Sequence, residues 1–199
     1  MPLGDLLRRR REEGQTCGAC GAHLVADAAF CHACGARTDD PDSQPLHVVD
    51  RATGLFNDRF LRPILEDELA RAHRYGRSLG VLMIEPATGG IELPPGEARD
   101  LLRLMAAAVA NTLRDVDTPG VLSHSPPSIL ALLPDTDASG TAHAAARVLE
   151  AVNAALGGRG SQVLLGIVCV NYGQRLRAGA VIDAATRALH SGRPEMIGQ

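Results

Sequence analysis

The chain has 199 residues, which is enough for one ordinary domain and a small additional module. Its hydrophobic content of 45% and charged fraction of 22% are typical of a globular protein. Aromatic residues make up only 3% and Trp is absent, so the core must be built from aliphatic side chains. The net charge of −3 gives the whole chain no signature of nucleic-acid binding.

No segment approaches the roughly 20 consecutive apolar residues of a membrane span. The N-terminus also lacks the apolar run of a signal peptide. We therefore expect a soluble, cytoplasmic protein that does not contact a membrane.

Residues 1–14 are expected to form a basic helix or arm. They carry four successive arginines, Arg8 to Arg11, which Glu12 and Glu13 partly neutralise. Such a run is typical of a solvated chain end, and it also suits an arm that binds an acidic partner or nucleic acid.

Residues 15–36 contain two Cys-x-x-Cys-Gly motifs. Two residues between thiolates let one tight turn aim both sulfurs at a single ion, and the glycine permits the left-handed backbone that the turn needs. Four thiolates complete the tetrahedral shell of structural zinc, which explains these cysteines better than disulfides in a reducing compartment. The predicted zinc ligands are Cys17, Cys20, Cys31 and Cys34.

A segment this small has almost no core of its own, so zinc binding would supply its folding free energy. With Phe30 before the third cysteine, the segment resembles the bacterial zinc-ribbon family. His23 and His32 lie nearby, but four cysteines fill the shell and both are expected to be exposed bystanders. Catalytic zinc would need an open coordination position. The fifth cysteine, Cys169, is expected to be a buried core thiol.

Residues 37–47 are polar and contain two prolines, which predicts a semi-extended linker. From Val48 onward, apolar periodicity predicts alternating helices and strands. The expected elements are a helix capped by Asn57 or Asp58, a strand at 79–84, a helix at 97–114, hairpin arms at 121–124 and 129–133, a helix to Leu156, a strand at 163–170 and a helix at 181–191.

This order is β-α-β-β-α-β with an extra helix before it and another after it, which is a ferredoxin-like α+β fold. We expect an antiparallel sheet with helices packed on one face. Leu61, Leu65, Leu69 and Ala72 form the expected apolar face of the first helix. The helix that ends at Leu156 is expected to face the core with Ala145, Val148, Leu149, Val152 and Leu156.

The order of elements matches the palm of nucleotidyl cyclases, and local motifs add to the likeness. The segment Asp50-Arg51-Ala52-Thr53-Gly54-Leu55-Phe56-Asn57-Asp58-Arg59-Phe60 resembles the D-x-L-T-G-L-x-N-R-R-x-F opening of GGDEF-type diguanylate cyclase domains. Segments 71–79, 132–136 and 184–190 resemble later motifs of that family in the same order. The resemblance implies a nucleotidyl-cyclase palm across residues 48–199.

The family signature itself is replaced by Ser125-Pro126-Pro127-Ser128-Ile129. The resemblance implies that a metal-binding Glu should stand where Ser128 is, whereas Glu85 matches the metal-binding Asp after the first strand. Proline offers no N–H to a phosphate, and its ring blocks a close approach.

Further positions of the family's active site are also altered. The expected lysine falls on Gly90, and residues 91–95 replace the loop of the guanine-contacting Asn. Asp100 matches a guanine-contacting Asp, although an acid in the first turn of a helix also stabilises the helix N-terminus. We therefore expect a degenerate domain without cyclase activity and without catalytic Mg²⁺.

Arg114-Asp115-Val116-Asp117 has the R-x-x-D form of the family's product-inhibition site. An Arg fork suits phosphate or a guanine edge, and a carboxylate can accept from guanine N–H groups. Arg114 and Asp117 are thus candidate ligand-binding residues. The alternative is an arginine at a helix C-terminus that pairs with nearby acids on the surface.

The sequence predicts a catalytically inactive diguanylate cyclase-like protein that acts as a regulatory, protein-binding module with a structural zinc ribbon. One alternative is a cyclic di-GMP receptor that uses Arg114 and Asp117. Another is binding of nucleic acid or the transcription machinery through the zinc ribbon. The ribbon carries Ala, Gly and His rather than Lys and aromatic residues, which favours docking of a protein.

Overall fold

The structure is a computed structural model that describes residues 16–40, 47–87, 94–123, 126–157 and 162–198. The chain divides into two units, residues 1–47 and 48–199. The predicted basic arm, most of the linker and the signature position Ser125 lie outside the described residues. None of the helices that the structure describes combines the length and hydropathy needed to cross a bilayer.

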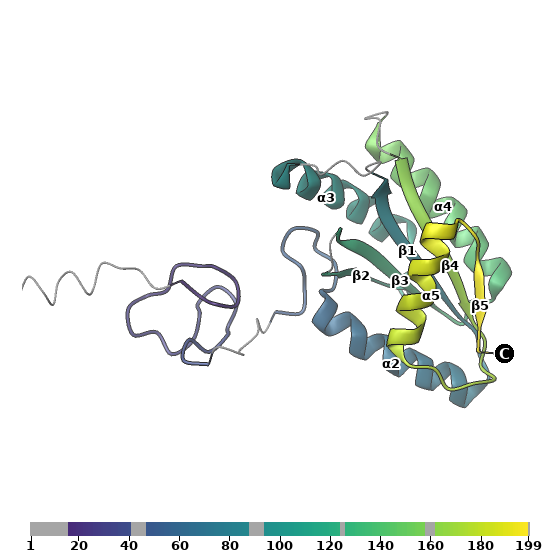
Figure 1. Ribbon diagram of the computed structural model, residues 1–199, viewed down its shortest axis with the longest axis horizontal. Helices are drawn as coiled ribbons and strands as arrows, with labels where there is room; N and C mark the ends of the chain where they lie inside the picture. Colours follow the sequence, from purple (N-terminus) through teal and green to yellow (C-terminus); the bar gives the residue numbers. More distant parts are fainter. Residues whose placement is uncertain (1–15, 41–46, 88–93, 124–125, 158–161, 199) are drawn as a thin grey trace, which may run out of the picture. The chain divides into compact units, whose positions relative to one another are not determined.

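The larger unit contains helices and strands in nearly the predicted order (Figure 1). The elements are α2 (Asp58–Tyr75), β1 (Leu79–Ala87), α3 (Pro95–Thr112), β2 (Thr118–Leu122), β3 (Ser128–Pro134), α4 (Ala138–Leu156), β4 (Gln162–Val170), α5 (Ala178–Ser191) and β5 (Glu195–Ile197). The sheet has the order β2-β3-β1-β4-β5. Its first four strands pair antiparallel, as expected, and β5 pairs parallel with β4.

The two helices within the β-α-β-β-α-β order cover one face of the sheet, as expected, and the two extra helices cover the other face. Alternate residues of the central strands point to opposite faces, and the core forms two clusters. α2 and α5 cover one face and α3 and α4 the other (Figure 1). The first cluster includes Leu61, Val81, Leu130, Val168 and Val181. The second includes Leu82, Met105, Ile129, Val148 and Ile167.

Two expectations need correction. The first hairpin arm, expected at 121–124, is β2 at Thr118–Leu122, because Thr118 and Pro119 already pair with β3. Leu149 on α4 is 36% exposed rather than buried, since the buried stripe of this helix runs through Ala145, Val148 and Val152.

The motif that opens the larger unit forms a structural turn. The Asp50 carboxylate accepts hydrogen bonds from the backbone N–H and the hydroxyl of Thr53. Gly54 has a φ of 77°, which glycine adopts without steric cost. Asn57 then caps α2 by accepting a hydrogen bond from the Phe60 N–H at 3.0 Å, and the helix continues through Pro63. The motif therefore sets where the fold begins.

Candidate functional site

The resemblance to GGDEF domains implies that their signature falls on the turn between β2 and β3. β2 ends at Leu122 and β3 begins at Ser128, and these two residues face each other in the ladder. The Ser123 N–H donates to the Asp58 carboxylate at 3.4 Å, which ties this turn to the first residue of α2.

Glu85 and Ser128 occupy adjacent positions on the two central strands. Ile84 on β1 pairs with Ile129 on β3, and both belong to the core beneath α3 and α4. Glu85 follows that pair and Ser128 precedes it, so by the alternation of strand residues both point to the opposite face. Both residues are buried. The structure thus brings together the two positions that the resemblance assigns to metal ligands.

The chemistry available at this pair is limited. A two-metal site clamps the attacking and leaving oxygens of a displacement, and oxygen-rich, anionic ligands must hold the ions. Glu85 provides one carboxylate, whereas Ser128 provides a neutral hydroxyl. The pair is therefore a poor anchor for two divalent ions.

Asp100 lies exposed near the start of α3. It lines a hollow of about 820 Å³ together with the Asp50–Gly54 turn and two arginines of α3, Arg99 and Arg103. The position that the resemblance matches to a guanine-contacting Asp is thus accessible.

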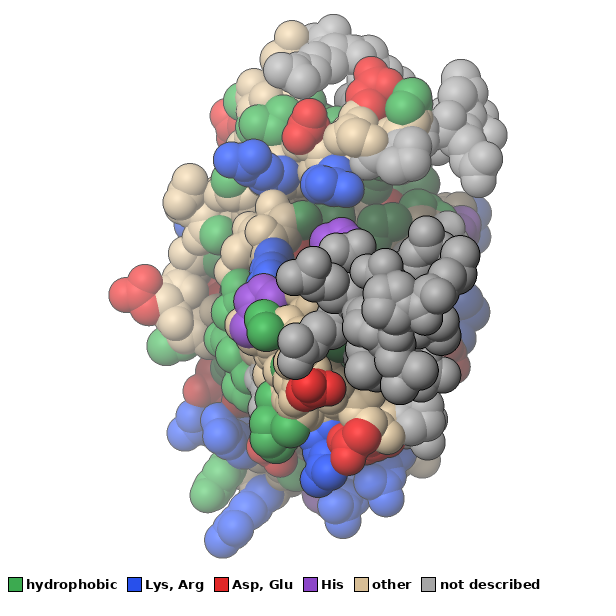
Figure 2. Space-filling model, turned by 90° about the vertical axis from the view of Figure 1, so that its left-hand side faces the viewer, with side chains coloured by type: hydrophobic (Ala, Val, Ile, Leu, Met, Phe, Trp, Pro, Cys, Tyr) green, Lys and Arg blue, Asp and Glu red, His purple; other side chains and the backbone are tan. Residues whose placement is uncertain are grey.

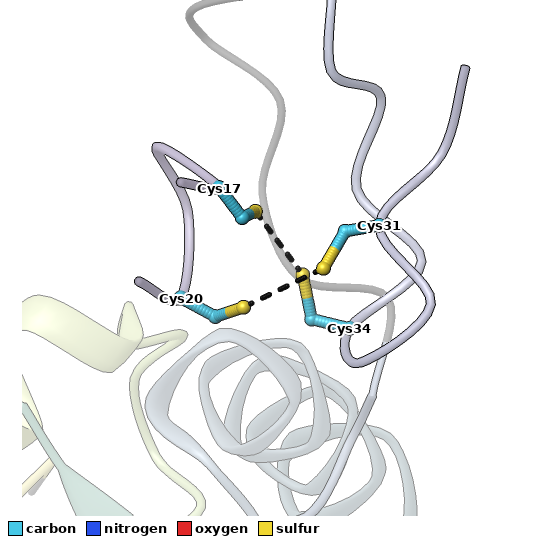
Figure 3. Close-up of side chains that lie close together, drawn as sticks. All are labelled: Cys17, Cys20, Cys31 and Cys34. Atoms are coloured by element: carbon cyan, nitrogen blue, oxygen red, sulfur yellow. Dashed lines mark hydrogen bonds between the residues drawn. The ribbon is translucent and has the colours of Figure 1, made fainter. Parts of the chain in front are cut away.

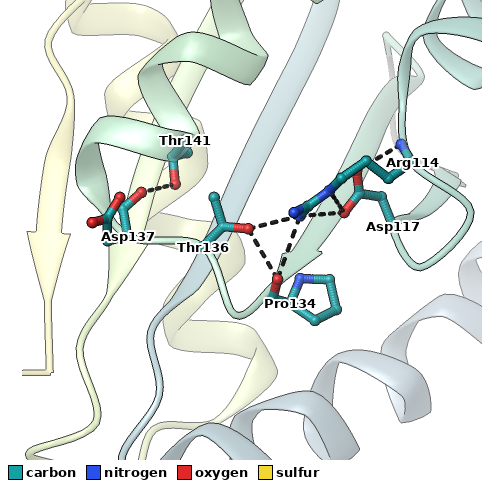
Figure 4. A network of polar contacts seen from close by, with 6 residues as sticks. All are labelled: Arg114, Asp117, Pro134, Thr136, Asp137 and Thr141. Atoms are coloured by element: carbon teal, nitrogen blue, oxygen red, sulfur yellow. Dashed lines mark hydrogen bonds and ion pairs between the residues drawn. The ribbon is translucent and has the colours of Figure 1, made fainter.

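Arg114 and Asp117 are brought together, and they bind each other (Figure 4). The Arg114 guanidinium contacts the Asp117 carboxylate at 2.8 Å, and the Arg114 backbone N–H donates to the same carboxylate at 2.9 Å. In return the Asp117 N–H donates to the Arg114 carbonyl. The side chain of Asp117 is only 1% exposed, so the carboxylate faces the protein.

The same guanidinium reaches the far end of the hairpin. It donates to the hydroxyl of Thr136 at 2.8 Å and to the Pro134 carbonyl at 3.4 Å. Its hydrogen bonds to Asp117 raise the pKa of Arg114, so the charge is retained. These contacts join the turn after α3 to the end of β3, and we call Arg114, Asp117 and Thr136 the hairpin latch.

The second candidate site is the cluster of four cysteines in the smaller unit (Figure 3). Each Cys-x-x-Cys segment folds into the same turn. In the first, the Gly21 N–H donates to the Cys17 carbonyl at 2.8 Å. In the second, the Gly35 N–H donates to the Cys31 carbonyl at 2.8 Å. Both glycines have positive φ angles, 72° and 74°.

The sulfur positions fit a tetrahedral metal ion. The Sγ atoms of Cys17 and Cys34 are 3.7 Å apart, as are those of Cys20 and Cys31, and all four lie within 4.8 Å of one another. Four sulfurs at a Zn–S distance of about 2.3 Å would stand about 3.8 Å apart. All five cysteines of the chain are unbridged. The four cysteines can therefore bind a metal such as zinc.

Two of the four thiols, Cys31 and Cys34, have pKa values shifted in opposite directions. Burial raises the pKa of Cys31, but the N–H groups of Ala33 and Cys34 and the neighbouring thiols outweigh it and lower the pKa to about 6. Burial and the other three thiols raise the pKa of Cys34 to about 12. Without a cation, thiolates this close repel one another, and a divalent ion would relieve the repulsion. His23 and His32 are exposed.

Cys169 on β4 lies in the core, where burial raises the pKa of its thiol. A buried thiol of this kind is poorly reactive.

No protein-family model matches the chain, and no curated protein matches it either. Solved structures do. The diguanylate cyclase SiaD from Pseudomonas aeruginosa, in complex with its activator SiaC, matches with a TM-score of 0.63 and 24% identity over 75% of this chain. The FimX GGDEF domain from the same organism matches with a TM-score of 0.63 and 12% identity, over 76% of this chain and all of that domain.

The coiled coil and GGDEF domain of DgcB from Caulobacter crescentus, in complex with c-di-GMP, matches with a TM-score of 0.61 and 16% identity. That match covers 75% of this chain and 85% of the other. The chain has the fold of GGDEF domains. It spans 61% of the length of the SiaD chain.

The sequence did not indicate the part that Thr136 plays in the hairpin latch. Its hydroxyl both accepts from Arg114 and donates to the Pro134 carbonyl at 2.9 Å. A Thr just before the cap of α4 signals local capping chemistry rather than a contact with a residue 22 positions earlier.

Proposed function

We propose that this chain is a non-catalytic member of the GGDEF fold that acts as a regulatory module by binding a protein, with a structural zinc site in its N-terminal unit. The observation that carries the proposal is the pair at the end of the central strands. Glu85 stands beside a buried serine rather than a second carboxylate.

Two further observations support the loss of catalysis. Pro126 and Pro127 occupy the turn that leads into β3, and a proline offers no N–H to a phosphate. Beside this altered turn, β1 pairs with β3 from Leu79 to Ile84, mostly through apolar residues. A retained core with a dismantled reaction site is what we expect of a scaffold that binds a partner.

The zinc assignment rests on the donor set. Four thiolates select soft or borderline ions, and a closed Cys₄ tetrahedron is typical of structural zinc. In this proposal Cys17, Cys20, Cys31 and Cys34 hold the ion and tie the two turns together. The described ribbon residues, 16–36, contain Asp27 and no Lys or Arg, so they present no basic surface for nucleic acid.

The test is a turnover assay on the zinc-loaded full chain with GTP and either Mg²⁺ or Mn²⁺. SiaD serves as the positive control in the same buffer. We expect no cyclic di-GMP above the enzyme-free background. Robust production of cyclic di-GMP would refute the proposal.

A second candidate function is binding of cyclic di-GMP at the hairpin latch. It is favoured by the half-exposed guanidinium of Arg114, which borders a hollow of about 580 Å³ beside the first turn of α4. The buried carboxylate of Asp117 opposes it, because the acid is already used within the protein. Calorimetry with cyclic di-GMP tests this second function. A heat of binding that is present in the parent chain and lost in Arg114→Ala would establish the receptor.

A further inference from the structure

A groove of about 660 Å³ runs between the second half of α2 and the turns that follow α3 and β3. Its floor includes Leu79, which belongs to the core beneath α2 and α5. Its rim carries three arginines from three different segments, together with Tyr75 and Val116. The arginines are Arg71, Arg77 and Arg114.

Each rim arginine is paired with its own acid, and in two of the pairs the acid lies underneath. Arg71 is 66% exposed above Glu68, which is 14% exposed. Arg114 is 50% exposed above the buried Asp117. Arg77 and Asp135 are both exposed. Solvent therefore meets guanidinium groups at this rim, although the pairs balance in formal charge.

On the face shown in Figure 2, Lys and Arg side chains at the lower end stand among Asp and Glu side chains. Arg74 of α2 adds a further charge near the groove, with its guanidinium carbon 5.5 Å from the centre of the Tyr75 ring. This contact is short enough for a cation–π attraction, which orients the ring.

Two apolar side chains stand exposed on the same rim. Tyr75 and Val116 are 61% and 64% exposed, among the most exposed large hydrophobic residues that the structure describes. Tyrosine and arginine are the residue types enriched at the centres of protein–protein interfaces. A rim of exposed Tyr, Val and Arg is therefore suited to a partner that supplies both apolar and acidic groups.

We propose that this groove docks an acidic segment of a partner protein, with carboxylates on Arg71 and Arg77 and an apolar side chain between Tyr75 and Val116. The inference rests on the proposed function as a protein-binding module and names the surface and the partner's chemistry. The three guanidiniums stand on three separate segments of the rim and are each at least half exposed, so the groups that a partner could contact are spread along the groove. Spaced carboxylates of a peptide match that spread better than one compact phosphate group.

The experiment selects binders from a random dodecapeptide library displayed on phage, using the zinc-loaded full chain as bait. Recovered peptides are expected to be enriched in Asp and Glu flanking a large apolar residue. The enriched peptide is then synthesised with a fluorophore and titrated by anisotropy. Its affinity should fall as salt is raised, because solvent-exposed charge pairs are screened.

Three variants test the groove. Arg71→Gln with Arg77→Gln should weaken the peptide about tenfold, and Tyr75→Ala should do so by about the same factor. Arg187→Gln is the matched control, because Arg187 on α5 is also 60% exposed and paired with an acid, Glu195, outside the groove. That control should bind like the parent chain.

The proposal would be overturned if no peptide were recovered or if the recovered peptides lacked acidic enrichment. It would also be overturned if the peptides bound all variants equally. Tyr75→Ala removes an exposed ring, so this variant should stay folded. It therefore still tests the groove if the double arginine variant unfolds. The turnover assay is independent of this result. An inactive protein without acidic binders would leave the proposed lack of catalysis standing and remove only the groove.

Discussion

Asp117→Ala removes the acceptor at the centre of the hairpin latch. The carboxylate is 1% exposed and accepts from the Arg114 backbone N–H at 2.9 Å and from its guanidinium at 2.8 Å. Hydrogen bonds to a charged partner contribute about 1.5–3 kcal/mol, so we expect the free energy of unfolding to fall by about 2–3 kcal/mol. For a unit of about 150 residues this lowers the Tm by about 5–10 °C.

The assay is thermal unfolding monitored by circular dichroism. Urea titration is the second measurement, with the same dependence of unfolding free energy on urea concentration used for parent and variant. Asp115→Ala is the matched control, because Asp115 is an exposed acid in the same turn. That variant should stay within about 0.5 kcal/mol of the parent chain. Asp117→Asn keeps an acceptor but loses the charge, and it should fall between the two.

An Asp117→Ala variant as stable as the parent would refute the latch. If that variant also lost binding of cyclic di-GMP, the R-x-x-D segment would be a ligand site rather than a structural contact. If Asp117→Ala were less stable than the parent chain, and neither protein bound cyclic di-GMP, the structural interpretation would hold.

Two further predictions concern packing and metal. Gly166→Ala should destabilise the larger unit by about 1–3 kcal/mol in urea titration, because a Cβ there would stand 2.6 Å from the Ala185 carbonyl oxygen of α5. Gly179→Ala, where the space is open, should be neutral or mildly stabilising, and equal costs for the two would contradict this packing. Chelation of the metal should unfold residues 16–40 and make them protease-sensitive while the larger unit keeps its melting transition, and an unchanged digestion pattern would contradict a metal-dependent fold.

Much of the fold follows from local sequence signals. The apolar spacing of Leu61, Leu65 and Leu69, together with the Asn57 cap, predicted α2, and the structure confirms these features. The position of α2 and α5 on the second face of the sheet was not predicted, although a signal existed. β3 is apolar at nearly every position, which is typical of a strand buried on both sides rather than one.

Other features depend on contacts between distant residues. β5 has three residues and pairs parallel with β4, so no local periodicity marks it. The guanidinium of Arg114, which holds the Asp117 carboxylate, also donates to Thr136 from the far end of the hairpin. The spacing of Arg114 and Asp117 therefore predicted that both residues could act together, but it could not show that they would bind each other.

We propose that the chain has no cyclase activity, because Pro126 and Pro127 occupy the turn and Glu85 is the single carboxylate at the end of the central strands. The most direct measurement incubates labelled GTP with a molar excess of the zinc-loaded full chain and Mn²⁺, and separates the products by chromatography. Under these conditions even one turnover per chain would be visible. We predict that the label stays in GTP, and a cyclic di-GMP peak that grows with time and with the concentration of the chain would contradict the account.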